Sequence, residues 1–208
     1  MGAYIAPLRD SMNAIMNEVI GTSPEEMFAD KPESPLSSFV ADLLREAAIK
    51  ELKELGKEQL PVITVINIRG LRSSLPKGPI KVKHIYALMP FENQMVTLKM
   101  PGKDIKKLYQ HMGESNGDGL SGGSFTFTDR SVKNPKINNQ PVRDEASYYV
   151  VTSDYLATGG DHYTIFANAT EKLESSQKIR NLIIRHIRDL EKQGSPIPVP
   201  SNTRVEMQ

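Results

Sequence analysis

The chain has 208 residues, enough for one domain or one domain with an arm, and its 38% hydrophobic and 25% charged residues are typical of a soluble globular protein. A formal net charge of +1 gives no overall argument for binding nucleic acid or an anionic membrane. The absence of cysteine excludes disulfides, zinc–thiolate sites and thiol catalysis. The sequence shows no signal peptide and no apolar run near the roughly 20 residues that span a bilayer.

Two helices are predicted in the first 56 residues. The first is amphipathic and ends near Gly21, because apolar side chains recur at helical spacing. These side chains are Leu8, Met12, Ile15, Met16 and Val19. Residues 22–35, with three prolines among acidic and small residues, are expected to form a loop. Ser34 or Ser37 is expected to cap a second amphipathic helix that runs to about Leu55.

A strand buried on both faces is predicted at 62–66, where a nearly continuous apolar run follows a proline. Asn67, Arg69 and Arg72 come directly after this run. Polar groups at the end of a buried strand commonly build a site, although a solvated loop is the alternative interpretation. The other predicted elements are a short helix or turn at 82–88, a strand at 95–100, a helix through 105–112, a glycine-rich loop at 113–124, a strand at 125–128, a helix at 176–192 and a short strand at 203–207.

The stretch 148–166, YYVVTSDYLATGGDHYTIF, combines a buried strand with a tight turn. Residues 148–152 are β-branched or aromatic, as in a buried strand. The adjacent glycines 159 and 160 permit a sharp reversal, which lets Tyr155 and Asp161 face one small space. A ring and a carboxylate suit a ligand with a planar part and hydroxyls. The alternative is a hairpin-like turn with a surface tyrosine.

No local pattern indicates autonomous metal-dependent catalysis. The four histidines, at 84, 111, 162 and 186, are scattered and lack metal-ligand spacing. The sequence contains no protein-kinase motif set. A local basic stretch at 69–83 could bind phosphate groups, but RNA binding is the less favoured alternative because no stacking aromatic motif accompanies it.

Four ordered segments together resemble one family. They read NIRGLRSSLPKGPI, HIYALMPFENQMVTLKMPGKDIKKLYQH, SGGSFTF and YYVVTSDYLATGGDHYTIF. Their order and spacing resemble the C-terminal domain of the 5′-nucleotidases, a family that includes bacterial UDP-sugar hydrolases and animal ecto-enzymes. The resemblance implies an α+β fold with a mixed sheet packed with helices in α/β/β/α layers. It covers about 33–168, so we expect an N-terminal helix or arm at 1–30 and the substrate-binding domain at 31–208.

The resemblance also implies which residues bind a ligand. In the family this domain binds the base and sugar of a nucleotide. Two aromatic rings sandwich the base, and an Arg, an Asn and an Asp hold the ribose or phosphate. Phe91 and Tyr155 match the two rings. The other matching positions are Asn67, Arg72, Asn93, Gly122 as a close-approach glycine, and Asp161 as the ribose-binding carboxylate.

The sequence departs from the family pattern near this site. Lys31 lies where a family arginine is expected, and Arg69 replaces a glycine of the NxGGIR motif. Tyr155 keeps a ring and adds a hydroxyl. The family's metallophosphatase domain, which carries the divalent metals and the catalytic histidine, has no counterpart in these residues. The resemblance therefore implies no catalytic residue and no metal or other cofactor here.

We therefore expect a substrate-binding half of a 5′-nucleotidase, acting in nucleotide catabolism with a metallophosphatase domain or separate chain as its partner. The alternative is a stand-alone nucleoside- or nucleotide-binding module without catalysis. By resemblance the protein is expected to be bacterial and periplasmic or extracellular, without a membrane segment. Whether a leader was removed stays open.

Overall fold

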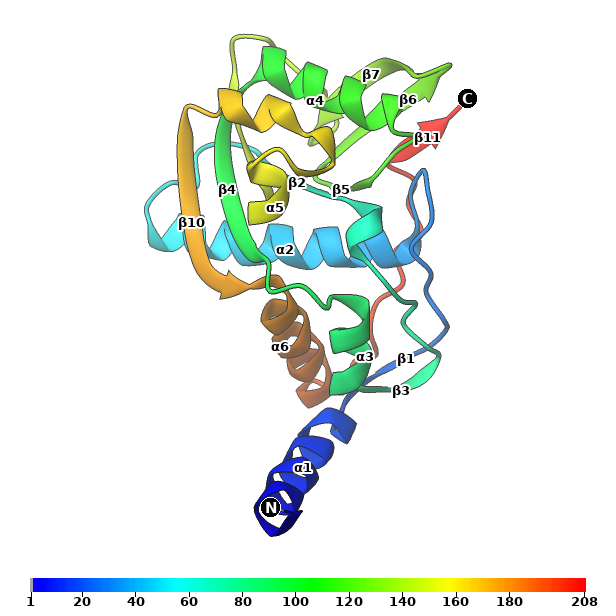
Figure 1. The fold of residues 1–208 in the computed structure, drawn as a ribbon. Helices are drawn as coiled ribbons and strands as arrows, with labels where there is room; N and C mark the ends of the chain where they lie inside the picture. Colours follow the sequence, from blue (N-terminus) through cyan, green and yellow to red (C-terminus); the bar gives the residue numbers. More distant parts are fainter. Residues whose placement is uncertain (1) are drawn as a thin grey trace.

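A five-stranded mixed sheet forms the centre of the fold in this computed structural model, which describes residues 2–208 (Figure 1). The strand order is β10-β4-β9-β2-β5, and the bounds are β2 (Val62–Ile66), β4 (Gln94–Pro101), β5 (Gly119–Ser121), β9 (Ser147–Ser153) and β10 (Glu171–Lys178). β2 and β9 are parallel, and the other neighbouring pairs are antiparallel. The predicted class, α+β with a mixed sheet packed with helices, is confirmed.

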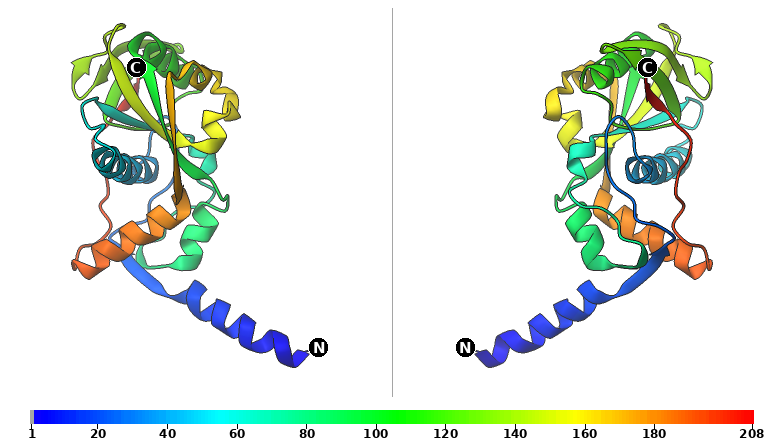
Figure 2. Two further views of the ribbon diagram at one scale, coloured as in Figure 1. Left: turned by 90° about the vertical axis from the view of Figure 1, so that its left-hand side faces the viewer. Right: turned by 90° about the vertical axis from the view of Figure 1, so that its right-hand side faces the viewer.

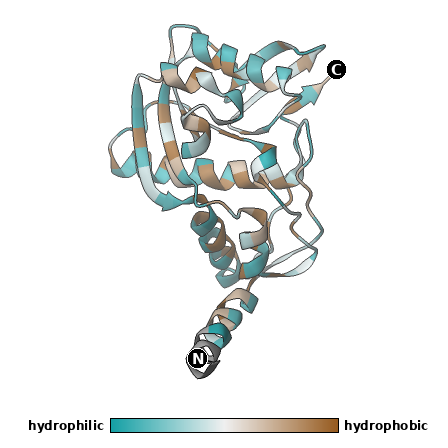
Figure 3. Cartoon of the chain, viewed as in Figure 1, coloured by the Kyte–Doolittle hydropathy of each residue, from teal (hydrophilic) through white to brown (hydrophobic). Residues whose placement is uncertain are grey.

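Each face of this sheet packs on its own hydrophobic core. Val62 and Ile66 of β2 face one core, and Ile63 and Val65 face the other, so the predicted burial of this strand on both faces is confirmed. The first core includes residues of α2 (Pro35–Glu54), α3 (Val82–Leu88) and α6 (Ile179–Lys192). Figure 3 shows hydrophobic residues along α2 and the central strands.

A second sheet closes the other core, in the order β11-β6-β7-β8. Its strands are β6 (Gly123–Thr128), β7 (Ser131–Ile137), β8 (Gln140–Pro141) and β11 (Val205–Met207), and α4 (Gly102–Glu114) packs beside them. β11 runs parallel to β6, which confirms the predicted short strand near the end of the chain. Elements far apart in the sequence therefore share one apolar interior.

The start of α2 shows why the helix begins at this point. Ser34 and Ser37 form a capping box, in which each side chain accepts a hydrogen bond from the other residue's backbone N–H. Pro35 occupies the first turn, where a missing N–H costs no hydrogen bond. The helix ends before Gly56, whose φ of +67° suits glycine. The predicted cap and end are confirmed.

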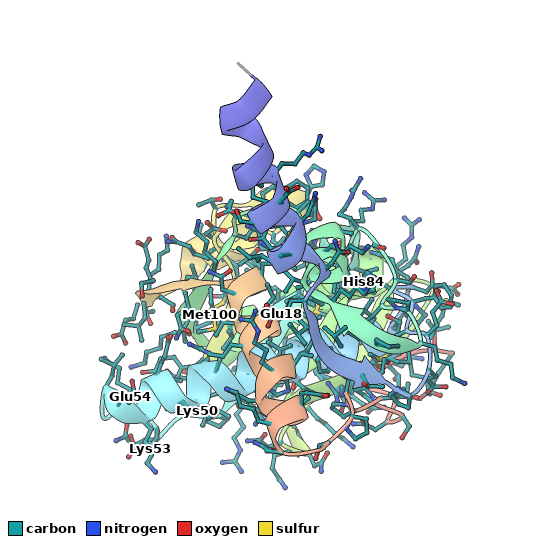
Figure 4. All side chains as sticks on the ribbon, turned by 90° about the horizontal axis from the view of Figure 1, so that it is seen from below. Glu18, Lys50, Lys53, Glu54, His84 and Met100 are labelled. Atoms are coloured by element: carbon teal, nitrogen blue, oxygen red, sulfur yellow. The ribbon has the colours of Figure 1, made fainter. Side chains whose placement is uncertain are left out.

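The N-terminal helix α1 (Gly2–Asn17) projects away from the body of the fold (Figures 1 and 2). The prediction that it extends to Gly21 is wrong. The helix ends at Asn17, and the chain continues as the strand β1 (Val19–Ser23), which pairs with β3 (Gly78–Lys81). Glu18 lies between α1 and β1 and accepts a hydrogen bond from Arg188 of α6 at 2.6 Å. Figure 4 shows Glu18 in a view of the molecule from below. Part of the predicted arm at 1–30 thus pairs with a strand of the predicted 31–208 domain.

The sequence-based prediction also missed strands. The segment 113–124 is not all loop, because α4 continues to Glu114 and β5 begins at Gly119. Gly119 packs so closely on β2 that a Cβ would lie 2.6 Å from Ile66 Cγ1, which explains a glycine within a strand. β10 was not predicted either, since its sequence EKLESSQK is mostly polar. Across residues 2–208 no helix is long and apolar enough to span a bilayer.

Candidate ligand-binding site

A pocket of about 390 Å³ opens at one edge of the central sheet. β2 and β9 are parallel and end at this edge, and Met95 of the antiparallel β4 pairs with Ser153, so the residues before β4 lie at the same edge. The lining residues are Ile66, Asn67, Arg69, Gly70, Arg72, Met89, Phe91, Asn93, Ser153, Tyr155, Asp161 and Ile179. Six of the seven predicted site residues thus line one pocket: Asn67, Arg72, Phe91, Asn93, Tyr155 and Asp161.

The seventh, Gly122, does not line this pocket. It lies between β5 and β6 with a φ of +74°. A Cβ there would come within 2.4 Å of both the carbonyl oxygen of Val62 and Nε of Arg45. The backbone conformation and the close packing against β2 both explain the glycine without a ligand.

The segment that carries Phe91 is fixed by Arg180 from α6. This buried guanidinium donates to the carbonyl oxygens of Met89 and Pro90 at 3.2 and 3.1 Å, and it forms an ion pair with Glu92. It also lies 4.1 Å above the ring centroid of Tyr86. The Phe91 ring stays 51% exposed, so the backbone beside it is anchored while the ring is accessible at the pocket.

Tyr155 lies in the first turn of α5 (Asp154–Ala157), which Ser153 caps by accepting a hydrogen bond from Leu156 N at 3.2 Å. Its ring rests on Gly160, where a Cβ would lie 2.5 Å from ring carbons. This close approach explains the glycine at 160. The ring remains 46% exposed at the pocket.

Asp161 is oriented by two donors. Its Oδ2 accepts from Asn67 Nδ2 at 2.6 Å and its Oδ1 accepts from the Tyr155 hydroxyl at 2.9 Å. A carboxylate has about four acceptor positions, so lone pairs remain for ligand hydroxyls. The backbone of Asp161 has a φ of 49° and that of His162 a φ of 65°, a left-handed conformation that non-glycine residues rarely adopt.

Sequence reasoning missed the buried group behind this site. Asp118 accepts hydrogen bonds from Ile68 N and from the Tyr163 hydroxyl, and Lys31 Nζ lies 3.6 Å from it. Burial raises the pKa of Asp118, while the Tyr163 hydrogen bond and the Lys31 charge act in the opposite direction. The sequence feature that could have indicated Asp118 is an acidic residue between two glycines, GDG, inside the segment that was interpreted as a loop.

A second cavity of about 530 Å³ adjoins the pocket and shares Arg69, Tyr155 and Asp161 with it. Lys31, His111, Glu114 and Asp118 are among its other lining residues. Among the described residues, no group of three or more His, Cys, Asp or Glu side chains is arranged to hold a metal ion. The side chains that line the pocket and this cavity offer hydrogen-bonding groups, charges and aromatic rings to a ligand.

A family model for the 5′-nucleotidase C-terminal domain matches residues 19–168, most of the chain. The chain belongs to this family. The matched range contains all seven predicted site residues as well as β1, which the motifs had not included. The predicted family is thus confirmed.

Two curated proteins are similar to parts of this chain. The chain is 23% identical over 183 residues to the trifunctional nucleotide phosphoesterase protein YfkN of Bacillus subtilis, covering 78% of this chain and 12% of that protein. It is 29% identical over 99 residues to protein UshA of Escherichia coli, covering 45% of this chain and 18% of UshA. The chain thus spans less than a fifth of either relative.

A solved structure supports the fold over almost the whole chain. The 5′-nucleotidase precursor from Thermus thermophilus superimposes with a TM-score of 0.82 at 21% identity, covering 98% of this chain and 42% of that one. At this identity the likeness shows the fold alone. Membership of the 5′-nucleotidase C-terminal domain family supports a nucleotide-binding role for the domain.

Proposed function

We propose that this domain binds the nucleoside part of a nucleotide in the pocket at the edge of the central sheet. The base stacks between Phe91 and Tyr155, and Asp161 accepts hydrogen bonds from the ribose hydroxyls. The observation that carries this proposal is that two half-exposed rings and an oriented carboxylate line one pocket of about 390 Å³. A pocket of this size lies within the usual range of roughly 300–1,000 Å³ for small-molecule sites.

Stacking explains why two large rings stay exposed at the pocket. A base that stacks on an aromatic side chain contributes about 1–3 kcal/mol, and every base has a face that can stack. We therefore expect the domain to tolerate different bases. Asn93, which follows Phe91 by two residues in the same pocket, is the candidate hydrogen-bond partner for the base edge.

Two arginines supply positive charge beside the proposed ribose position. Arg69 and Arg72 both line the pocket, and within residues 2–208 neither forms an ion pair with a carboxylate. Arg72 donates weakly to the Arg69 carbonyl oxygen at 3.4 Å. A guanidinium can donate two parallel hydrogen bonds to a phosphate, so this edge suits the phosphate of a nucleotide.

Hydrolysis then requires chemistry that this pocket does not provide. A metallophosphatase, either another domain of the same protein or a separate chain, would supply the divalent metals and the nucleophile for cleavage of the 5′-phosphate ester. This domain contributes binding energy and orientation. We place this activity in nucleotide catabolism, in the periplasm or outside the cell of a bacterium.

Calorimetric titration of the purified chain tests the proposal. Adenosine and uridine are expected to bind with micromolar to millimolar affinity, and ribose 5-phosphate more weakly because it has no base. Phe91→Ala should weaken adenosine binding by about 1–3 kcal/mol. Phe28→Ala is the matched control, because Phe28 is 53% exposed and does not line the pocket. Absence of nucleoside binding at millimolar concentration would contradict the proposal.

A further inference from the structure

Asp118 connects three parts of the chain from a buried position behind the pocket. Only 3% of its surface is exposed, and it lies between α4 and β5. Its Oδ1 accepts a hydrogen bond from Ile68 N at 2.9 Å, and its Oδ2 accepts one from the Tyr163 hydroxyl at 2.6 Å. Lys31 Nζ, 3.6 Å from Oδ1, partly compensates its negative charge.

Both hydrogen-bond donors lie next to residues of the pocket. Ile68 directly follows Asn67, and Tyr163 is two residues after Asp161. Asn67 Nδ2 in turn donates to Asp161 Oδ2 at 2.6 Å. The segments therefore form a closed ring of contacts: Asp118 holds one residue beside Asn67 and one beside Asp161, and Asn67 and Asp161 bind each other.

The turn that carries Asp161 needs such support. Asp161 and His162 both have positive φ, and residues keep this conformation where surrounding contacts fix it. Tyr163 provides the anchor, since its ring is buried, stacks on Phe166 at a centroid distance of 5.4 Å and meets His111 edge-on at 4.4 Å. His111 Nε2 also lies 3.3 Å from the Asp161 carbonyl oxygen.

We propose that Asp118 is a positioning residue for the ligand-binding carboxylate, holding the Asn67 segment and the Asp161 turn in the geometry that receives the ribose. This inference rests on the proposed function. Asp118 lies behind the residues that would touch the ligand, so its effect on affinity passes through Asp161 and Asn67. A buried aspartate that serves stability alone would have no such route to the ligand.

Asp104 provides the matched comparison. It is a buried aspartate with 4% of its surface exposed, and Lys107 donates to its Oδ1 at 2.9 Å on α4. It does not line the pocket or the adjoining cavity. Asp104→Asn and Asp118→Asn therefore make the same chemical change at similar burial, one remote from the site and one behind it.

The experiment is calorimetric titration with adenosine of the wild-type chain, the two asparagine variants, Asp161→Asn and the Asp118→Asn/Asp161→Asn double variant. In the wild-type background, Asp118→Asn is expected to lower adenosine affinity about tenfold, because a charge-assisted hydrogen bond is lost. When Asp161 is already changed to Asn, the same substitution is expected to lower affinity less than about twofold. Asp104→Asn should leave affinity unchanged. Tyr163→Phe, which removes the donor and keeps the ring, should act in the same direction as Asp118→Asn and replaces it if that variant does not fold.

Equal losses in both backgrounds, or no loss for Asp118→Asn and Tyr163→Phe, would overturn the positioning role. If the wild-type chain binds adenosine, either result leaves the proposed function standing. If the wild-type chain does not bind adenosine, the proposed function itself fails. Thermal unfolding of each variant verifies that affinities are compared between folded proteins.

Discussion

Tyr155 offers the pocket two different groups, a ring and a hydroxyl. The motif alone predicts that Tyr155→Phe is nearly silent, because the ring is kept. In the structure the hydroxyl donates to Asp161 at 2.9 Å, so the phenylalanine variant loses one of the two side-chain donors that orient this carboxylate. We therefore expect Tyr155→Phe to weaken adenosine binding by about 0.5–1.5 kcal/mol, the net contribution of a typical hydrogen bond.

Tyr155→Ala should cost more, about 1–3 kcal/mol, since it also removes the stacking ring. Calorimetry of both variants against adenosine separates the two contributions. An affinity of Tyr155→Phe equal to that of the wild type would show that the hydroxyl has no part in positioning Asp161. Equal losses for the two variants would instead assign the effect to the hydroxyl and leave the ring without a stacking role.

Single residues also show what the sequence could predict. Asn67, Phe91, Tyr155 and Asp161 lie in short motifs, so local resemblance was enough to locate them, and the structure places them around one pocket. The contacts of Asp118 could not be found in this way. Its partners Ile68 and Tyr163 are 50 and 45 positions away along the chain, and no local spacing indicates such pairs.

The short helix α3 begins with a contact that depends on pH. His84 Nδ1 accepts a hydrogen bond from Lys81 N at 3.1 Å, so this nitrogen must be unprotonated. Burial, together with the charges of Lys83 and Lys81, lowers the pKa of His84. Since the unfolded chain then binds the proton more readily than the folded one, stability is complete at high pH and falls as pH drops below the unfolded histidine pKa.

His186 contributes in the same direction, because burial lowers its pKa as well. We therefore expect the melting temperature to fall between about pH 7.5 and about pH 5, the range in which histidine titrates. The fall should be smaller in His84→Asn, whose amide oxygen can accept the bond at every pH. Differential scanning calorimetry at the two pH values measures both quantities. An identical pH dependence in wild type and variant would exclude a contribution from His84.

Two helices with apolar stripes illustrate why burial, and not pattern, decides stability. Leu44 of α2 is fully buried in the first core, whereas Ile15 of α1 is 58% exposed. Leu44→Ala should destabilise the fold by about 2–5 kcal/mol through lost burial and the cavity left behind. Ile15→Lys should leave the free energy of unfolding within about 0.5 kcal/mol of wild type. Denaturant titration compares the two, and a large loss for Ile15→Lys would mean that α1 packs on the body of the fold.

Elements with a strong apolar signal were predicted and polar ones were not. The runs at 62–66 and 148–152 and the stripe of α2 predicted β2, β9 and that helix correctly. β10 is an edge strand that alternates exposed and half-buried residues, so its polar sequence contains little evidence of a strand. Val19, the first residue of β1, continues the helical spacing of the apolar residues in α1, so the sequence pattern does not mark the helix end. The pairing of β1 with β3, a long-range contact, sets that end.

At the scale of the whole molecule, binding and catalysis belong to different parts of the proposed enzyme. The described residues line the pocket that we propose for a nucleoside, and they include no group of three or more His, Cys, Asp or Glu side chains that could hold a metal ion. The purified chain should therefore release no phosphate from AMP in the presence of Mn²⁺, Co²⁺ or Zn²⁺. A metallophosphatase encoded with this chain or beside it should hydrolyse AMP faster once the chain is added, because the domain raises the local concentration of oriented substrate.

Asp161→Ala tests whether that gain comes from the pocket. Asp161 belongs to no group of described residues that could hold a metal ion, yet its loss should lower the reconstituted rate if it holds the ribose as proposed. Arg143→Gln is a suitable control, because Arg143 is exposed and lies outside both cavities. The measurement is phosphate release from AMP by the metallophosphatase alone, with the wild-type chain and with each variant. If the metallophosphatase alone is as active and selective as the mixture, this chain is not its substrate-binding half. If the gain in rate survives Asp161→Ala, the substrate contacts another part of the domain.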